Sequence, residues 1–337
     1  MAGSLTSYGH TTSQAFIEAQ QYSQFILENL YDVLLPEGMW RDVSDFGAGT
    51  TLNVKTVGSV TLQEAAEDVP LVYNPIDTGS VTLTITDYVG DAWRVTDDLR
   101  EDGAQIDTLM GMRAMESTRA LGEHHETRFL STAEGALTAL SATGVAPVNG
   151  RPHRWIAGGS GVTTRIMSFS DFVAMKLAFD KANVPQAGRI AIVDPIVEAT
   201  INSLVLNTNV ITNSNPQFEG LMTTGFAQSH RFVRNIMGFD VYTSNFVPTY
   251  GAASAIDASS YGLANTTTAT TDVANIFMCV ADDGCKPIMH AWRRMPKTEG
   301  WRDEETRSDK FQVTSRFGFG AQRLDTLGVI YTTSLTY

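Results

Sequence analysis

The feature that most constrains the fold of this 337-residue chain is a pair of alternating segments between Gly47 and Val95. Apolar side chains occupy every second position in both segments, at Leu52 and Val54 and then at Val81, Leu83 and Ile85. Such alternation is typical of β-strands, and the turn residues of Gln63–Gly79 lie between them. We therefore expect a long β-hairpin. A two-stranded ribbon is marginal alone in water, so this hairpin must pack on another surface, such as a second subunit.

Two helical segments flank the predicted hairpin. Before it, apolar residues recur at steps of three and four over Ser13–Leu35, which predicts an amphipathic helical arm that ends at Pro36. After it, the acidic residues near Asp98 favour a helix N-terminus, and Asp98 and Glu101 have the spacing of a capping box. We expect one long helix from Asp98 to about Ala133, interrupted at Gly103 or Gly111.

Adjacent histidines in "LGEHHETRFL", Leu121–Leu130, raise the question of a metal site. Two histidines that share a metal from one helix must stand four residues apart, because only then do both rings leave the same face. His124 and His125 fail that test, and the residue four past His124 is Arg128, a cation. We expect no metal here and a polar helix surface instead.

The remainder alternates between helix and strand. A connector with Gly and Pro, Ala142–Thr164, separates the two halves. The predicted order is a capped helix in Ser168–Asn183, a buried strand in Gly188–Pro195, a helix from Pro195 to Leu206, a strand in Ile236–Pro248, a surface loop in Thr249–Asp272, and strands in Ala274–Ala281 and Asp309–Thr333. This mixture favours a compact α/β lobe.

The charge balance disfavours several functions. Acidic residues number 37 and basic residues 24, a net charge of −13, whereas duplex-binding proteins neutralise phosphates with cations. Arg41 is the first basic residue, and secretory and mitochondrial leaders need basic residues near the N-terminus. No apolar run approaches the ~20 residues that span a bilayer. We expect a protein of the cytosol that does not contact membranes.

Sequence motifs for catalysis are weak. Cys279 and Cys285 lack the spacing of a redox pair, so we expect reduced, near-core thiols. Gly158–Gly161 lacks the lysine of a phosphate-binding loop. Acidic clusters such as Asp303–Glu305 are explained by helix capping and ion pairs as well as by acid–base chemistry. We predict no enzyme, no catalytic residues, no cofactor and no metal.

The order of these parts resembles the major capsid protein of tailed double-stranded-DNA bacteriophages, the Johnson-type shell fold also found in encapsulins and herpesvirus shells. The local segments that carry the resemblance are "GRIAIVDPIVEATI", "NIMGFDVYTSNFVP" and "RFGFGAQRLDTLGVIYT". The resemblance implies an α+β fold with an N-arm, an extended β-hairpin loop, a long spine helix, a peripheral domain and an α/β axial domain.

The resemblance also implies the boundaries of these regions. They are residues 1–46 for the N-terminal arm, 47–96 for the extended loop, 97–164 for the spine helix and first part of the peripheral domain, 165–281 for the axial domain, and 282–337 for the C-terminal strands of the peripheral domain. The segment "LGEHHETRFL" then lies in the last part of the spine helix.

The expected function is an icosahedral shell around packaged DNA that is not bound by sequence. The implied partners are other copies in hexamers and pentamers, a separately encoded scaffolding protein, a portal at one vertex and a decoration protein, with assembly in the host cytoplasm. Some family members crosslink a lysine of the extended loop, for which Lys55 is the sole candidate here. We expect Lys55 to be an ordinary strand residue.

Charge suggests where subunits meet. The hairpin tip carries Glu64, Glu67 and Asp68, and the basic concentration of the chain includes Arg293, Arg294 and Arg302, with Arg307 nearby. We expect the acidic tip of one subunit to meet these arginines on a neighbour.

Two rival functions stay open at this stage. An encapsulin-type shell has the same fold but holds a cargo enzyme in place of a genome. An α/β enzyme would need a pocket with convergent titratable groups.

Overall fold

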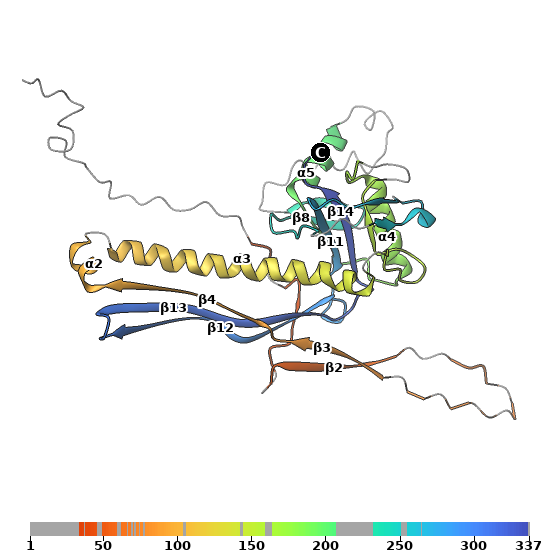
Figure 1. Ribbon diagram of the computed structural model, residues 1–337. Coiled ribbons are helices and arrows are strands. Elements are labelled where there is room, and N and C mark those ends of the chain that lie inside the picture. Colours follow the sequence, from red (N-terminus) through yellow and green to blue (C-terminus); the bar gives the residue numbers. More distant parts are fainter. Residues whose placement is uncertain are drawn as a thin grey trace, which may run out of the picture.

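A computed structural model shows a lobe from which a long helix and a long β-sheet extend side by side, with a separate hairpin projecting on the other side (Figure 1). The structure describes residues 34–335 except 37, 46–48, 59–61, 66, 69, 71, 74, 77, 104–105, 142–143, 159–163, 207–231, 251–254 and 264. The predicted helical arm, Ser13–Leu35, lies outside the described residues apart from its last two positions.

The long helix is divided, as predicted, near Gly103. The short helix α2, Asp97–Asp102, is followed by α3, Ile106–Leu140, which continues seven residues past the predicted end and includes Gly111. One side of its second half, with Phe129, Leu130, Ala133 and Leu137, is fully buried in the core. These positions are spaced by one, three and four residues, so they lie on one stripe of the helix.

A four-stranded sheet lies along α3 in the order β1-β12-β13-β4. Its strands are β1, Arg41–Asp42; β12, Ile288–Asp303; β13, Ser308–Ala321; and β4, Asp87–Thr96. Ion pairs attach β4 to the helix: Arg113 of α3 binds Asp91 at 2.7 Å, and Arg128 binds Asp87 at 2.9 Å. The helix covers one face of this sheet (Figure 1).

The predicted hairpin forms, but it is shorter than expected. Strand β2, Thr51–Val57, pairs antiparallel with β3, Thr78–Thr84, and places Leu52 opposite Leu83. The next strand, β4, does not continue the hairpin. It pairs with β13, and every second side chain, such as Asp91, faces α3. The hairpin therefore ends at Thr84, and the peripheral sheet begins at Asp87.

The base of the hairpin packs on the sheet face opposite α3. Leu83 and Ile85 are buried there against Met289 and Ala291 of β12. This packing requires Gly318 of β13, because a Cβ at that position would meet the carbonyl oxygen of Thr84 at 2.7 Å.

The lobe is built on a six-stranded sheet of order β5-β14-β11-β6-β8-β7. The strands are β5, Arg154–Ile156; β6, Arg189–Val193; β7, Phe232–Ile236; β8, Phe239–Thr243; β11, Asp272–Cys279; and β14, Leu327–Thr333. Helix α4, Phe169–Lys181, covers one face through Phe172, which contacts Phe277. The second half of α3 lies on the other face, where Tyr331 donates a hydrogen bond to Glu134 at 2.9 Å.

Two local predictions in the lobe are confirmed. Ser168 and Asp171 form the capping box of α4, and α5 spans Pro195–Leu206 as its opening proline indicated. Both cysteines are free thiols, with Cys279 buried.

Other predictions in and around the lobe need correction. Strand β14 was assigned to the peripheral part, but it pairs with β11 and β5, because all seven of its residues are buried and fit only the middle of a covered sheet. The connector before residue 165 contains β5, which forms an edge of the same sheet. The single strand predicted in Ile236–Pro248 is the second half of the β7–β8 hairpin.

The predicted surface loop Thr249–Asp272 also has structure of its own. It contains the paired strands β9, Ala255–Asp257, and β10, Asn265–Thr267, joined through a short 3₁₀ turn, Ser259–Tyr261. Ile256 is fully buried, which anchors this small sheet to the lobe.

Candidate functional site

A basic hollow lies on the sheet face that α3 does not cover. It has a volume of about 550 Å³ and is lined by Thr86, Tyr88, Arg293, Arg294 and Arg316. Arg294 stands opposite Arg316 across the β12–β13 ladder, between two register shifts of β12. The bulged backbone there brings guanidinium groups of two strands to one place, which suits carboxylates or other anions.

The surroundings of the hollow already hold one carboxylate. Arg294 binds Glu299 of its own strand at 2.8 Å, and Lys297 binds the same carboxylate at 2.9 Å. The Lys297 hydrogen bond, followed by the charge of Arg294, lowers the pKa of Glu299. A carboxylate from elsewhere would therefore meet a site that is built to accept that group.

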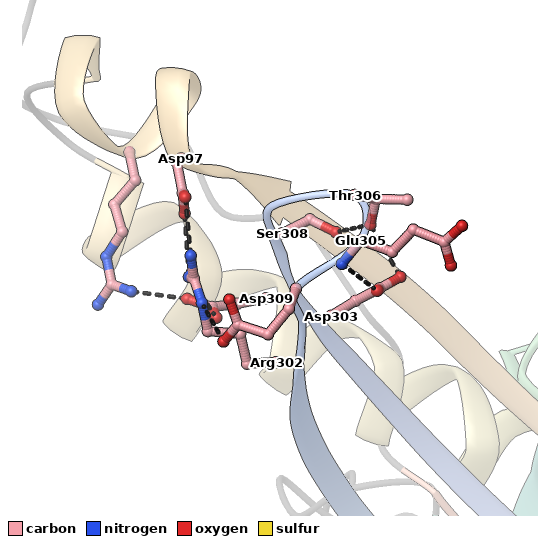
Figure 2. A network of polar contacts seen from close by, with 9 residues as sticks. Asp97, Arg302, Asp303, Glu305, Thr306, Ser308 and Asp309 are labelled. Atoms are coloured by element: carbon pink, nitrogen blue, oxygen red, sulfur yellow. Dashed lines mark hydrogen bonds and ion pairs between the residues drawn. The ribbon is translucent and has the colours of Figure 1, made fainter.

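Arg302, which the sequence grouped with these arginines, forms its ion pairs with carboxylates of its own chain. Its guanidinium makes a bidentate pair with Asp97 of α2, at 3.0 and 2.8 Å, and also contacts Asp309 at 3.3 Å. Figure 2 shows Arg302 between these two carboxylates. Hydrogen bonding to Arg302 is the largest cause of the lowered pKa of Asp97. Arg302 thereby joins the start of α2 to the outer end of the sheet.

The turn beyond Arg302 is organised by Asp303. Its carboxylate accepts hydrogen bonds from the Glu305 amide at 3.1 Å and the Thr306 hydroxyl at 2.8 Å (Figure 2). It also pairs with Lys310. The bond from Lys310 is the main reason that the pKa of Asp303 falls to about 2. This acidic cluster thus forms a turn and an ion pair within its own chain, and Asp303 caps no helix.

The predicted basic concentration is therefore divided. Arg302 lies eight positions after Arg294 on β12, which corresponds to about 26 Å at ~3.3 Å per residue. Arg293, Arg294 and Arg316 form the inner group, and Arg302 belongs to the ion-pair network at the outer end. The sequence missed Arg316 and Tyr88, because only strand register brings them to the hollow.

The acidic tip of the hairpin is fully outside the folded core. Glu64, Glu67 and Asp68 are all exposed in the segment between β2 and β3. Gln63 closes this segment through two hydrogen bonds with the Val72 backbone, at 2.8 and 3.1 Å.

Large apolar side chains accompany the acidic ones. Leu62, Val72, Tyr73 and Ile76 are 91%, 70%, 98% and 80% exposed. Figure 1 shows this segment and the outer end of β12 and β13 at opposite ends of the molecule. Lys55 is also exposed, in β2 opposite Ser80.

The histidines at 124 and 125 differ in environment. His124 is exposed, but His125 faces the sheet, where its Nε2 lies 3.0 Å from Nε2 of His290. The expectation that both lie on a polar helix surface is wrong for His125, because aromatic side chains of β12 and β13 surround it.

Two searches are negative in the part of the chain that the structure describes. No group of three or more His, Cys, Asp and Glu side chains is arranged to hold a metal ion there. Nor does any described helix combine the length and the apolar character required to cross a membrane.

A family model described as "Phage capsid protein" matches residues 78–332, which include α3, the four-stranded sheet apart from β1, nearly all of the six-stranded sheet and the residues of the basic hollow. The chain belongs to the phage capsid protein family. The prediction of a major capsid protein, the structural unit of a phage shell, is confirmed.

Solved shells have the same fold as this capsid protein. The capsid of cyanophage P-SCSP1u matches with a TM-score of 0.67 at 15% identity, covering 98% of this chain and 96% of the other. The mature capsid of bacteriophage PhiM1 matches with a TM-score of 0.67 at 12% identity, covering 98% of each chain. A protein of Mycobacterium phage Che8 matches with a TM-score of 0.63 at 12% identity, over 93% of this chain and 97% of the other.

These likenesses confirm the predicted α+β shell fold of the capsid protein. No curated protein sequence matches it significantly.

Proposed function

We propose that this capsid protein assembles into an icosahedral shell around double-stranded DNA by placing the tip of its hairpin on the basic hollow of a neighbour. The observation that carries the proposal is the exposure of Leu62, Val72, Tyr73 and Ile76 at that tip. Burying one such side chain fully contributes about 1.5–3 kcal/mol. A segment that leaves four of them in water gains most from contact with a second copy.

Charge gives this contact its direction. Glu64, Glu67 and Asp68 carry three negative charges at the tip, and the hollow carries Arg293, Arg294 and Arg316. Exposed ion pairs contribute little affinity each, about 0–1 kcal/mol, but opposite charges select the partner and the register. Apolar burial then supplies the larger part of the free energy, and closed symmetry repeats the contact at every subunit.

The regions of the shell fold are assigned on this basis. Residues 1–46 form the N-terminal arm and the β2–β3 hairpin with its tip forms the extended loop. Helices α2 and α3 with the four-stranded sheet form the peripheral domain, and the six-stranded sheet with α4 and α5 forms the axial domain. Strand β14 belongs to the axial domain, so that domain takes in residues from both sides of the predicted boundaries at 165 and 281.

The remaining partners follow from the same assignment. Hexamers and pentamers of the protein form with a separate scaffolding protein in the host cytoplasm, a portal occupies one vertex, and a decoration protein binds the finished shell. The net charge of −13 supports a wall that encloses DNA without binding it by sequence. The role is structural and not enzymatic.

Charge reversal tests the contact. The triple variant E64K/E67K/D68K is expected to yield unassembled protein, because its tip repels the arginines. R293E/R294E should fail for the same reason, and the two sets combined should restore shells. Electron microscopy and light scattering of the purified proteins measure the outcome, with E101K, a change at an exposed acid of α2, as the control.

Two results would overturn the contact. Normal assembly of both reversed variants would show that the tip and the hollow do not meet. Failure of the combined variant, with each protein still folded by circular dichroism, would show that they act in separate contacts.

An encapsulin-type shell is the second candidate, since it has the same fold. The matching capsid family favours the phage shell. The contents of particles purified from producing cells decide between them: packaged double-stranded DNA supports the phage shell, whereas a single co-purified enzyme supports the nanocompartment.

A further inference from the structure

A histidine pair lies between α3 and the four-stranded sheet. Nε2 of His125, from α3, and Nε2 of His290, from β12, are 3.0 Å apart. His290 is fully buried, and its Nδ1 has no hydrogen-bond partner among the described residues. These two residues are 165 positions apart in sequence, so their contact joins two separate elements of the peripheral domain.

Aromatic rings enclose the pair. Trp292 stacks on His125 with ring centroids 5.0 Å apart and planes inclined by 11°. Phe319 lies 4.8 Å from His125 and 4.7 Å from His290, and Trp40 lies 5.1 Å from His125. The pair therefore has an apolar environment that disfavours positive charge.

The contact cannot survive protonation of both rings. In an N–H···N hydrogen bond between two imidazoles, one Nε2 donates and the other accepts, so the bond tolerates one proton on the donor ring and is lost once both Nε2 atoms carry protons. Two imidazolium ions at this separation would repel each other. Burial is the largest cause that lowers the pKa of His125 to about 3 and that of His290 to about 4.

Few charged groups near the pair favour protonated rings. On β1, Asp42 faces His290 and raises its pKa, against the effect of burial. On α3, His124 lowers the pKa of His125, and Arg128 is paired with Asp87. Glu126 accepts a hydrogen bond from Ser244 of the axial domain and one from the Leu35 amide.

On β12 and β13, the neighbours that face the pair are Trp292, Phe317 and Phe319. Arg293, Arg294 and Arg316 of these strands line the hollow on the opposite face.

We propose that the His125–His290 pair is a proton-sensitive lock that holds α3 on β12 while both rings are neutral and releases it when the pair is protonated. The first proton places a cation inside the aromatic enclosure, and the second occupies the accepting Nε2, removes the N–H···N bond and sets two like charges about 3.0 Å apart. The Trp40 ring contacts both histidine rings, so the segment around Trp40 is released together with them. The lock rests on these contacts alone and is independent of how subunits meet.

The sign of the pH dependence follows from the lowered pKa values. Above the ordinary histidine pKa of 6.5, folded and unfolded chains both hold neutral rings, and the contribution of the pair is complete. Below it, the unfolded chain takes up protons that the folded chain refuses, so stability falls as the pH drops towards about 4.

Hydrogen exchange of the full-length protein tests the lock. Protection of amides in α3 around His125 and in β12 around His290 is measured between pH 7.5 and 4, after correction for the intrinsic rate. Wild type should lose protection as the pH falls below 6.5. The variant H125F/H290F, which keeps ring volume and removes both titrating groups, should keep its protection to a pH at least one unit lower. T118A, a change at an exposed position of α3 two turns before His125, should behave as wild type.

Loss of protection at the same pH in wild type and in H125F/H290F would overturn the lock. If the double variant does not fold at pH 7.5, H290Q carries the test. With one titrating ring left, proton uptake on unfolding between pH 6.5 and 4.5 should be lower than that of wild type by up to one proton, and unchanged uptake would overturn the proposal.

Discussion

Glu126 shows how one buried side chain holds three parts of the capsid protein together. It lies on α3, is 5% exposed, and accepts the Leu35 amide at 2.7 Å and the Ser244 hydroxyl at 2.6 Å. Leu35 leads from the N-terminal arm and Ser244 follows β8 of the axial domain. A buried carboxylate is costly without such donors, so each of these bonds stabilises both the charge and the junction.

Replacing Glu126 by alanine is expected to destabilise the protein strongly. The change leaves a buried amide and a buried hydroxyl without this acceptor, at about 1–3 kcal/mol for each unsatisfied group. Denaturant unfolding should show a lower free energy of unfolding, and E126Q, which keeps an acceptor oxygen, should lose less. E101A, at an exposed position of α2, is the control. An E126A protein as stable as wild type would remove the junction role from Glu126.

In strand β13, phenylalanines and glycines alternate, so the two faces of the strand make different contacts. In the segment "RFGFG", Phe317 and Phe319 face α3 and enclose the histidine pair. Gly318 and Gly320 face the other way and allow β3 to cross at backbone distance. One strand thereby supports the spine helix on one face and the base of the hairpin on the other.

A valine at Gly318 is expected to displace the hairpin. Its Cβ would stand 2.7 Å from the Thr84 carbonyl oxygen and 2.8 Å from Cα of Ile85, and backbone cannot move aside as a flexible side chain can. We expect the variant to lose protection of β2 and β3 in hydrogen exchange and to assemble poorly, while the α/β lobe keeps its protection. Unchanged protection of β3 would contradict this account of the crossing.

The spine helix offers the opposite case at Gly111. This residue is exposed within α3, and an added Cβ would meet nothing within 4 Å. Glycine costs roughly 0.5–1 kcal/mol relative to alanine in a helix interior, so G111A should raise the free energy of unfolding by about that amount. Thermal and denaturant unfolding measure it, and a decrease would mean that the position serves bending or contact in the shell.

Elements with local signals were predictable from the sequence. Pro195 set the start of α5, Ser168 with Asp171 set the start of α4, and Gly103 marked the end of α2. Each depends on residues a few positions apart. Strand β12 was missed, since its inner half is buried and its outer half is exposed, so no single period runs through it.

Partners distant in sequence were not predictable. Nothing near His125 indicates His290, because the packing of α3 on the sheet decides that contact, and nothing near Arg294 indicates Arg316, because strand register decides it. The sequence grouped Arg302 with Arg293 and Arg294, because nothing near Arg302 indicates its partner Asp97, which lies 205 residues away. Pairing of this kind depends on the whole fold.

At the scale of the whole molecule, the capsid protein joins two sheets of different character. The six-stranded sheet has helices on its faces and a continuous core, whereas the four-stranded sheet exposes large side chains, such as Tyr88 at the basic hollow and Trp301 towards the outer end, which are 62% and 47% exposed. The first sheet supplies stability to the subunit. The second, with the hairpin, offers surfaces that suit repeated contact in a shell.

The place of β14 also sets when the subunit can begin to assemble. This strand is the last in chain order, yet it lies inside the six-stranded sheet, between β5 and β11. A ribosome must therefore release residues through Thr333 before that sheet can close. Until then the nascent chain lacks the strand between β5 and β11, so we expect a chain to offer a finished lobe to its neighbours only after synthesis has passed Thr333.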